Sequence, residues 1–133
     1  MDRSFVCATF FCLMTCACSS SESGSDGAAP TIDNITMDKT TIGVGTTDSI
    51  TVTVDYSDPD ADVVRLSEQL SAPGFSTRPP NVMNVDGSGQ KQGRHAMVLQ
   101  VQVPTKATLD LSFWLTDAKG HDSVKVSRSI VAQ

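Results

Sequence analysis

The sequence predicts an all-β domain, a two-sheet antiparallel sandwich of about seven or eight strands, between Pro30 and Gln133. Four segments alternate apolar and polar residues with a period of two, which is typical of strands with one buried face and one face in solvent. Sequences rich in Asp, Gly and Pro separate these segments, as turns do between strands. No ten-residue window repeats its apolar residues at helical spacing. Many short strands with such turns favour a sandwich.

The strand segments fall into a strong and a weak group. The strong segments are Ser49–Ser57, Ala96–Val103, Thr108–Thr116 and Ser123–Val131. The weaker candidates are Thr31–Met37, Thr41–Val44, Asp62–Leu70 and Asn81–Val85. The last strong strand is expected to bury Val124, Val126 and Ile130 on one face, because these residues alternate with polar ones.

Three turn sequences separate the strong strands. Asp58–Ala61 ends the first, Asp86–Gly89 precedes the second and Asp117–Gly120 joins the last two. Pro104 ends the second strand, because proline has no N–H to donate to a ladder. Gly120 is free to adopt a positive φ in its turn.

All four cysteines lie within the first 18 residues. They are Cys7, Cys12, Cys16 and Cys18. The apolar stretch Phe5–Met14 is too short to span a bilayer, which needs about 20 residues, but it has the length of a secretory h-region. Cysteines confined to one apolar segment cannot cross-link a distant fold.

The sequence Leu-Met-Thr-Cys-Ala-Cys at residues 13–18 resembles the lipobox of bacterial lipoproteins, in which a small residue precedes the lipidated cysteine. Cys18 fits this position because Ala17 is small. Cys16 is the alternative, with Leu13 at the preferred position but Thr15 before it. The resemblance implies a signal peptide over residues 1–17 and a diacylated Cys18, and two acyl chains anchor a protein stably to a membrane. The other interpretations are an ordinary signal peptide cut elsewhere, and an N-terminal buried helix or disulfide framework.

Residues 18–29 are expected to form a tether to a domain spanning residues 30–133. The segment Ser19–Ala29 is rich in Ser and Gly and has no large apolar side chain, as in flexible linkers. The lipobox resemblance implies a protein of the cell envelope, held in the outer membrane or at the cell surface by its N-terminal lipid.

Three short motifs in the domain resemble bacterial immunoglobulin-like, PKD- or cadherin-like extracellular modules. They are Pro30–Ile35, Val52–Asp62 and Leu115–Gly120. The resemblance implies an immunoglobulin-like sandwich outside the cytoplasm. The chain departs from the usual Asp-Pro-Asp-Gly-Asp turn at Ala61, which stands in place of Gly. Such folds host many unrelated functions, so the resemblance implies no specific ligand.

The first turn holds the candidate metal ligands Asp58, Asp60 and Asp62. Alternating carboxylates can supply the oxygen ligands that Ca²⁺ takes, which makes Ca²⁺ the one candidate cofactor. The EF-hand spacing is absent, because Val63 and Gln69 stand where Gly and Glu are required. The alternative is that these aspartates stabilise the turn through their own backbone.

Trp114 is the candidate partner-binding residue. The alternation of Thr108–Thr116 places it on the polar face with Asp110 and Ser112, opposite the apolar residues. An exposed indole is a frequent binding hot spot for a protein or glycan. The alternative is that a neighbouring loop or the tether covers it.

The remaining features argue against catalysis and nucleic-acid binding. A net charge of −5 offers no basic surface for a phosphate backbone. His95 and His121 have no metal-binding spacing, and no serine is marked as a nucleophile beside a base. The sequence therefore predicts a non-enzymatic interaction or adhesion module with an unknown protein or glycan partner. The alternative is a structural envelope spacer, with or without calcium.

Overall fold

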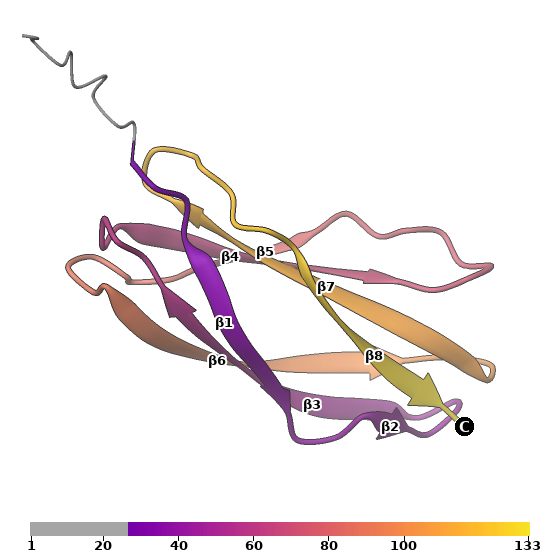
Figure 1. Ribbon diagram of the computed structural model, residues 1–133. Coiled ribbons are helices and arrows are strands. Elements are labelled where there is room, and N and C mark those ends of the chain that lie inside the picture. Colours follow the sequence, from indigo (N-terminus) through magenta and orange to yellow (C-terminus); the bar gives the residue numbers. More distant parts are fainter. Residues whose placement is uncertain (1–26) are drawn as a thin grey trace, which may run out of the picture.

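The computed structural model describes residues 27–133 of the chain. Cys16, Cys18 and the predicted signal peptide lie outside the described residues. Eight strands make up the regular structure of the described part, which contains no helix and thus none that is long and apolar enough to cross a membrane (Figure 1). The strands are β1 (Thr31–Met37), β2 (Thr41–Ile42), β3 (Thr47–Ser57), β4 (Val63–Ser71), β5 (Asn81–Asn84), β6 (Gln92–Gln102), β7 (Ala107–Asp117) and β8 (Val126–Ala132).

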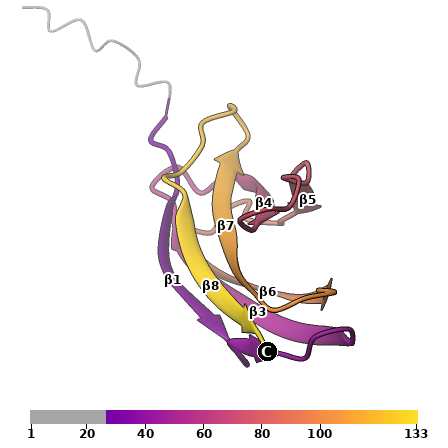
Figure 2. The ribbon, with the colours of Figure 1, turned by 90° about the vertical axis from the view of Figure 1, so that its right-hand side faces the viewer.

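The strands form two sheets, as the sequence predicts. One sheet has the order β1-β3-β6, and the other has the order β2-β8-β7-β4-β5. The short β2 pairs with β8 in parallel, and all other neighbours are antiparallel. Figure 2 shows β1 and β8 on one side of the sandwich and β5 on the other. Residue 27 and the C-terminus lie at opposite ends of it (Figure 1).

The core lies between the sheets and is built by the predicted alternation. The inward side chains of β3 and β7 are fully buried. These include Ile50, Val52 and Val54 from β3 and Leu111, Phe113 and Leu115 from β7. Each such side chain removed from water contributes about 1.5–3 kcal/mol to folding. The two strands therefore supply much of the apolar packing between the sheets.

The β3–β6 ladder is the longest pairing in the structure. It runs without a break from Thr47 opposite Gln102 to Ser57 opposite Gln92. The sequence predicts that β6 begins at Ala96, but pairing starts at Gln92. Gly93 permits this extension, because a Cβ at that position would overlap the ring of Tyr56.

The beginning of β8 differs from the prediction. Strand pairing starts at Val126, and Val124 is 84% exposed instead of buried. The reason is a local pair of hydrogen bonds at Ser123. Its N–H donates to the Leu115 carbonyl at 2.8 Å, and its hydroxyl oxygen accepts the Leu115 N–H at 2.9 Å. The side chain of Ser123 thus occupies the place of a backbone partner, and regular pairing begins only after it.

Candidate functional site

The turn with the candidate calcium ligands lies at the end of the sandwich where residue 27 enters. Asp58 is fully buried, and its carboxylate accepts the N–H groups of Asp60 at 3.2 Å and Asp62 at 2.7 Å. The Asp60 carboxylate instead accepts the N–H of Ala28 at 2.6 Å. The carboxylates of Asp58 and Asp60 therefore bond to different backbone segments.

The loop after β7 repeats this arrangement around Asp117. This buried carboxylate accepts the N–H groups of Lys119 at 2.9 Å and His121 at 2.8 Å, and its second oxygen lies 2.7 Å from His121 Nδ1. Burial alone would raise the pKa of Asp117, but the hydrogen bonds from His121 and Lys119 lower it overall. The N–H of Ala118 donates to the Asp62 carbonyl at 2.9 Å, so the two loops are joined.

Asp62 has the least favourable environment of these carboxylates. Its Oδ1 atom is buried and accepts no hydrogen bond from the described residues. Burial raises its pKa, and the negative charges of Asp117 and Asp58 raise it further. Within residues 27–133, no three Asp, Glu, His or Cys side chains are grouped so that they could hold a metal ion. Asp58 stabilises the turn through its own backbone, which is the alternative to calcium that the sequence offers, whereas Asp60 bonds to the segment before β1.

Ala61 adopts a φ of 58°, in the left-handed region where glycine is usual. Its N–H donates to the Asp58 carbonyl at 3.2 Å, and its own carbonyl accepts the N–H of Gly89 at 2.8 Å. The turn therefore keeps a conformation suited to glycine although the residue has a Cβ. An L-residue in this region carries a strain of about 1–2 kcal/mol.

Trp114 lies on the predicted outer face of β7, opposite the core residues, so the predicted register is confirmed. The predicted exposure is wrong, because only 9% of the residue is exposed. The Lys125 ammonium lies 4.1 Å from the ring centroid in a cation–π contact. The segment before β8 thus covers the indole, and little of it remains for a partner.

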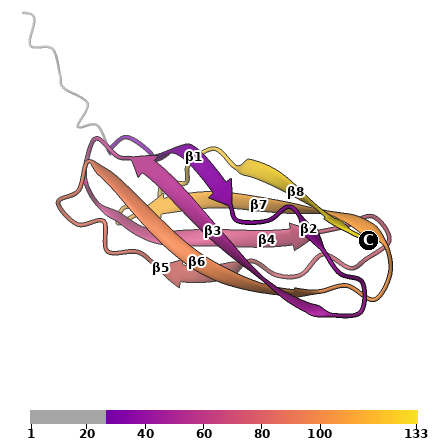
Figure 3. The same ribbon diagram turned by 90° about the horizontal axis from the view of Figure 1, so that it is seen from below.

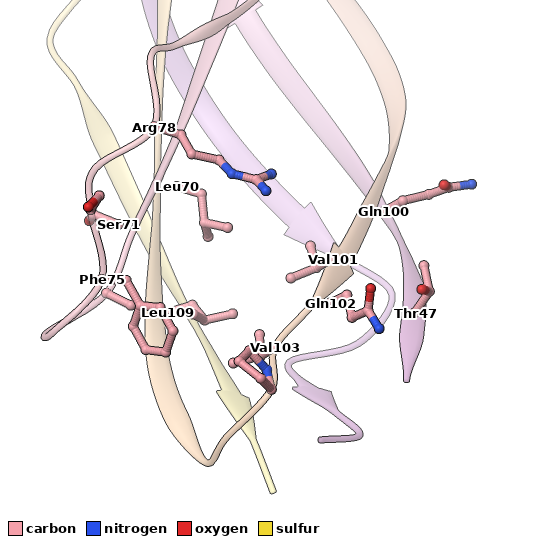
Figure 4. Close-up of a pocket in the computed structure, with 13 residues that line it drawn as sticks. Thr47, Leu70, Ser71, Phe75, Arg78, Gln100, Val101, Gln102, Val103 and Leu109 are labelled. Atoms are coloured by element: carbon pink, nitrogen blue, oxygen red, sulfur yellow. The ribbon is translucent and has the colours of Figure 1, made fainter. Parts of the chain in front are cut away.

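A groove that the sequence did not predict lies between the end of β6 and the loop after β4. It has a volume of about 580 Å³. Leu70, Val101 and Leu109 form an apolar wall, the Arg78 side chain extends into the groove, and Phe75 lies at its side, 43% exposed (Figure 4).

Glu68 lies on the inward face of β4, between Leu66 and Leu70 on the same face. An acidic residue at such a position is unusual, and the period of two in the sequence would have revealed it. Glu68 is 8% exposed, and burial raises its pKa while the charge of Arg78 opposes that rise. The inward acidic position was thus visible in the sequence, whereas the placement of Arg78 depends on how the loop after β4 folds.

No protein-family model and no curated protein matches the chain. Among solved structures, the PKD domain of an M14-like peptidase from a Thermoplasmatales archaeon matches with a TM-score of 0.51 and 18% identity, over 80% of this chain and 97% of that one. The fold is immunoglobulin-like. In the nomenclature of that fold, β1-β3-β6 correspond to strands A, B and E, and β2-β8-β7-β4-β5 to A′, G, F, C and C′.

Two further matches among solved structures belong to different proteins. A putative β-galactosidase from Bacteroides fragilis gives a TM-score of 0.58 at 13% identity over 75% of this chain, which spans only 17% of that enzyme. A Niemann-Pick type C2 protein from the Japanese carpenter ant gives 0.51 at 10% identity, over 80% of this chain and 95% of that one. At such identities, the likeness shows the fold alone.

We expect Ala61→Gly to stabilise the protein by about 0.5–1 kcal/mol. The substitution removes left-handed strain of about 1–2 kcal/mol, and the greater freedom of glycine in the unfolded chain offsets about 0.4–1 kcal/mol. Urea denaturation of the full chain measures the change. Gly120→Ala is the matched control, because Gly120 has a φ of 91° and open space at its Cβ position, and it should destabilise the protein. A loss of stability in Ala61→Gly would show that the left-handed conformation is not strained.

We expect Asp62→Asn to raise the melting temperature at pH 7. A raised pKa means that the folded state binds the Asp62 proton more tightly than the unfolded chain does. The tighter proton binding stabilises the folded state fully below the ordinary pKa of about 3.9. This stabilisation is lost as the pH rises through the raised pKa of Asp62. The advantage of the variant should therefore shrink as the pH falls through that value.

Asp60→Asn is the control for this comparison, because the Asp60 carboxylate has a hydrogen-bond partner in Ala28. A lower melting temperature for Asp62→Asn than for wild type at pH 7 would contradict the expectation. Millimolar Ca²⁺ that stabilises the wild type and not this variant would instead restore the predicted calcium site.

Proposed function

We propose that this chain is a lipid-anchored protein of the cell envelope whose immunoglobulin-like domain is a non-catalytic interaction module. The observation that carries the anchor is the placement of all four cysteines within the first 18 residues, with Ala17 and Cys18 directly before a Ser/Gly-rich segment. A secretory h-region, a small residue, a cysteine and a flexible tether follow one another in the order that an anchored domain requires.

The polar clusters of the domain support a non-catalytic role. The Asp117–His121 pair resembles the acid–imidazole pair that orients a general base in hydrolases. In residues 27–133, however, no hydroxyl or thiol hydrogen-bonds to the His121 ring. The pair closes its own loop instead, through two backbone N–H groups and one ring nitrogen. The Asp58 carboxylate likewise accepts two backbone N–H groups of its own turn.

We propose a structural spacer as the second candidate function. Residue 27 and Gln133 lie at opposite ends of the sandwich (Figure 1), so the domain would hold its far end one sandwich length from the membrane. A spacer needs stability and no binding surface. The two candidates therefore differ in whether the isolated protein binds a partner.

We expect cells expressing the wild-type chain to incorporate labelled palmitate into it, and Cys18→Ala to lose the label and leave the membrane fraction. Lipidation requires the cysteine thiol, and one acyl chain or none binds membranes weakly and reversibly. Cys16→Ala is the matched control and should keep the label. The reverse pattern would move the anchor to Cys16. Retention of label in both single variants and in the double variant would overturn the lipid anchor.

A further inference from the structure

The strand β6 has one unpaired edge along its full length. It borders the three-stranded sheet on the side away from β1, and β3 is its only strand partner in the described chain (Figure 3). Each alternate residue of an antiparallel strand directs both its N–H and its C=O to one side. Only every second residue of β6 therefore directs its N–H and C=O groups to the open edge.

Two hydrogen bonds settle the alternation. The N–H of Asp38 donates to the Thr51 carbonyl at 3.0 Å, so the backbone of Thr51 faces β1 and turns away from Val98, the residue opposite it in β6. The N–H of Asp58 donates to the Lys91 carbonyl at 2.9 Å, so Lys91 faces β3. Even-numbered residues of β6 therefore present their N–H and C=O groups to the open edge. They are Gln92, Arg94, Ala96, Val98, Gln100 and Gln102.

The other sheet edges are short or interrupted. β2 has two residues and β5 has four. The β1 edge is interrupted by a register shift between Ile32 and Asn34, and the Ile35 carbonyl accepts a hydrogen bond from the Arg128 side chain at 3.4 Å. Proteins commonly protect their edge strands by such devices.

β6 carries none of these protections. It has no proline, its register with β3 is unbroken over eleven residues, and Val98 at its middle is 63% exposed. An accessible edge of this length can pair with an added strand through main-chain hydrogen bonds. The contrast with the other edges indicates that β6 is available for pairing.

Charge indicates what kind of strand fits. The chain has a net charge of −5, yet the stretch Gly87–Leu109 contains no Asp or Glu. Its Arg94 pairs with Asp55 of β3, whereas Lys91 and Lys106, which flank β6, form no ion pair with any described residue. The groove at the end of β6 adds Arg78, whose charge acts on the buried Glu68 but which forms no salt bridge with any described residue (Figure 4). A second copy of β6 would bring another strand without acidic residues, flanked by the same two lysines, to this edge. An acidic segment would complement it.

We propose that β6 is a docking edge for an extended acidic segment of a partner protein, which adds to the sheet as a fourth strand. Backbone hydrogen bonds to the even-numbered residues hold the segment along the edge. On the face of the segment that points into the groove, an apolar side chain packs on the wall formed by Leu70, Val101 and Leu109, and a carboxylate two residues along pairs with Arg78. This inference rests on the proposed role as an interaction module and names its surface and the chemistry of its partner.

The probe is a fluorescein-labelled octapeptide with two Glu-Glu-Val-Val repeats, blocked at both ends, so that each face of the extended peptide carries both Glu and Val. Its binding to the full chain is followed by anisotropy. Val98→Pro removes an N–H that faces the open edge and no hydrogen bond to β3. We expect it to weaken binding at least tenfold, which corresponds to about 1.4 kcal/mol. Val98→Thr keeps the N–H and should bind like the wild type. Arg78→Gln should weaken binding several-fold.

The outcomes separate the alternatives. Absence of saturable binding by the Glu–Val peptide, or equal binding to Val98→Pro in a variant with an unchanged circular dichroism spectrum, would overturn the docking edge. Equal binding of a Lys–Val octapeptide would overturn the acidic preference. Self-association of the chain that Val98→Pro abolishes would assign the edge to a second copy, against the proposal. None of these results bears on the labelling of Cys18, so the proposed anchor stands or fails separately.

Discussion

The β3–β6 ladder is the pairing on which the rest of the structure depends. Side chains and backbone groups alternate with the same period of two along a strand. In β6, the residues that bond to β3 are therefore also those that turn their side chains to the core, as Met97, Leu99 and Val101 do. The residues between them present both backbone and side chain outward. A slip of one residue would expose the first set and bury the second. One register thus determines the core, the outer face and the open edge.

At the end of the sandwich where residue 27 enters, two buried aspartates stabilise two loops in the same way. Asp58 and Asp117 each accept two N–H groups of the loop that follows them. These bonds satisfy backbone donors that have no strand partner, which buried donors require. The arrangement is unfavourable for Asp62. Its carboxylate is close to the negative charges of Asp58 and Asp117, and its Oδ1 atom accepts no hydrogen bond from the described residues. Ala61 adds strain at the same turn. The turn is therefore locally destabilised by Asp62 and Ala61, and the hydrogen bonds that join the two loops must offset this free energy.

Much of the fold could be predicted from the sequence, because each sheet has one buried face and the alternation records it. All eight strands were identified, and the bounds of Thr31–Met37 were correct. The prediction failed at Val124 and at the exposure of Trp114 because both depend on the segment between β7 and β8. There, Ser123 replaces a ladder bond and Lys125 covers the indole. Alternation predicts the face of a residue, but it cannot predict what a neighbouring loop places on that face.

The candidate sites were less predictable for the same reason. The sequence draws attention to Asp58, Asp60 and Asp62, but the spacing of carboxylates does not reveal whether they converge on an ion or accept separate N–H groups. The groove and Arg78 depend on the loop after β4, which has no periodic pattern. The open edge of β6 depends on which strands are neighbours, and strand order is a property of the whole sandwich.

Amide hydrogen exchange along β6, followed residue by residue by NMR, tests the central claim most directly. The account predicts an alternation, because an amide bonded to β3 exchanges only when the ladder opens, whereas an amide at the open edge exchanges freely. His95, Met97, Leu99 and Val101 should be protected, and Arg94, Ala96, Val98 and Gln100 should exchange much faster. Equal protection of both sets in the free protein, or faster exchange of the odd-numbered set, would contradict the register and with it the open edge.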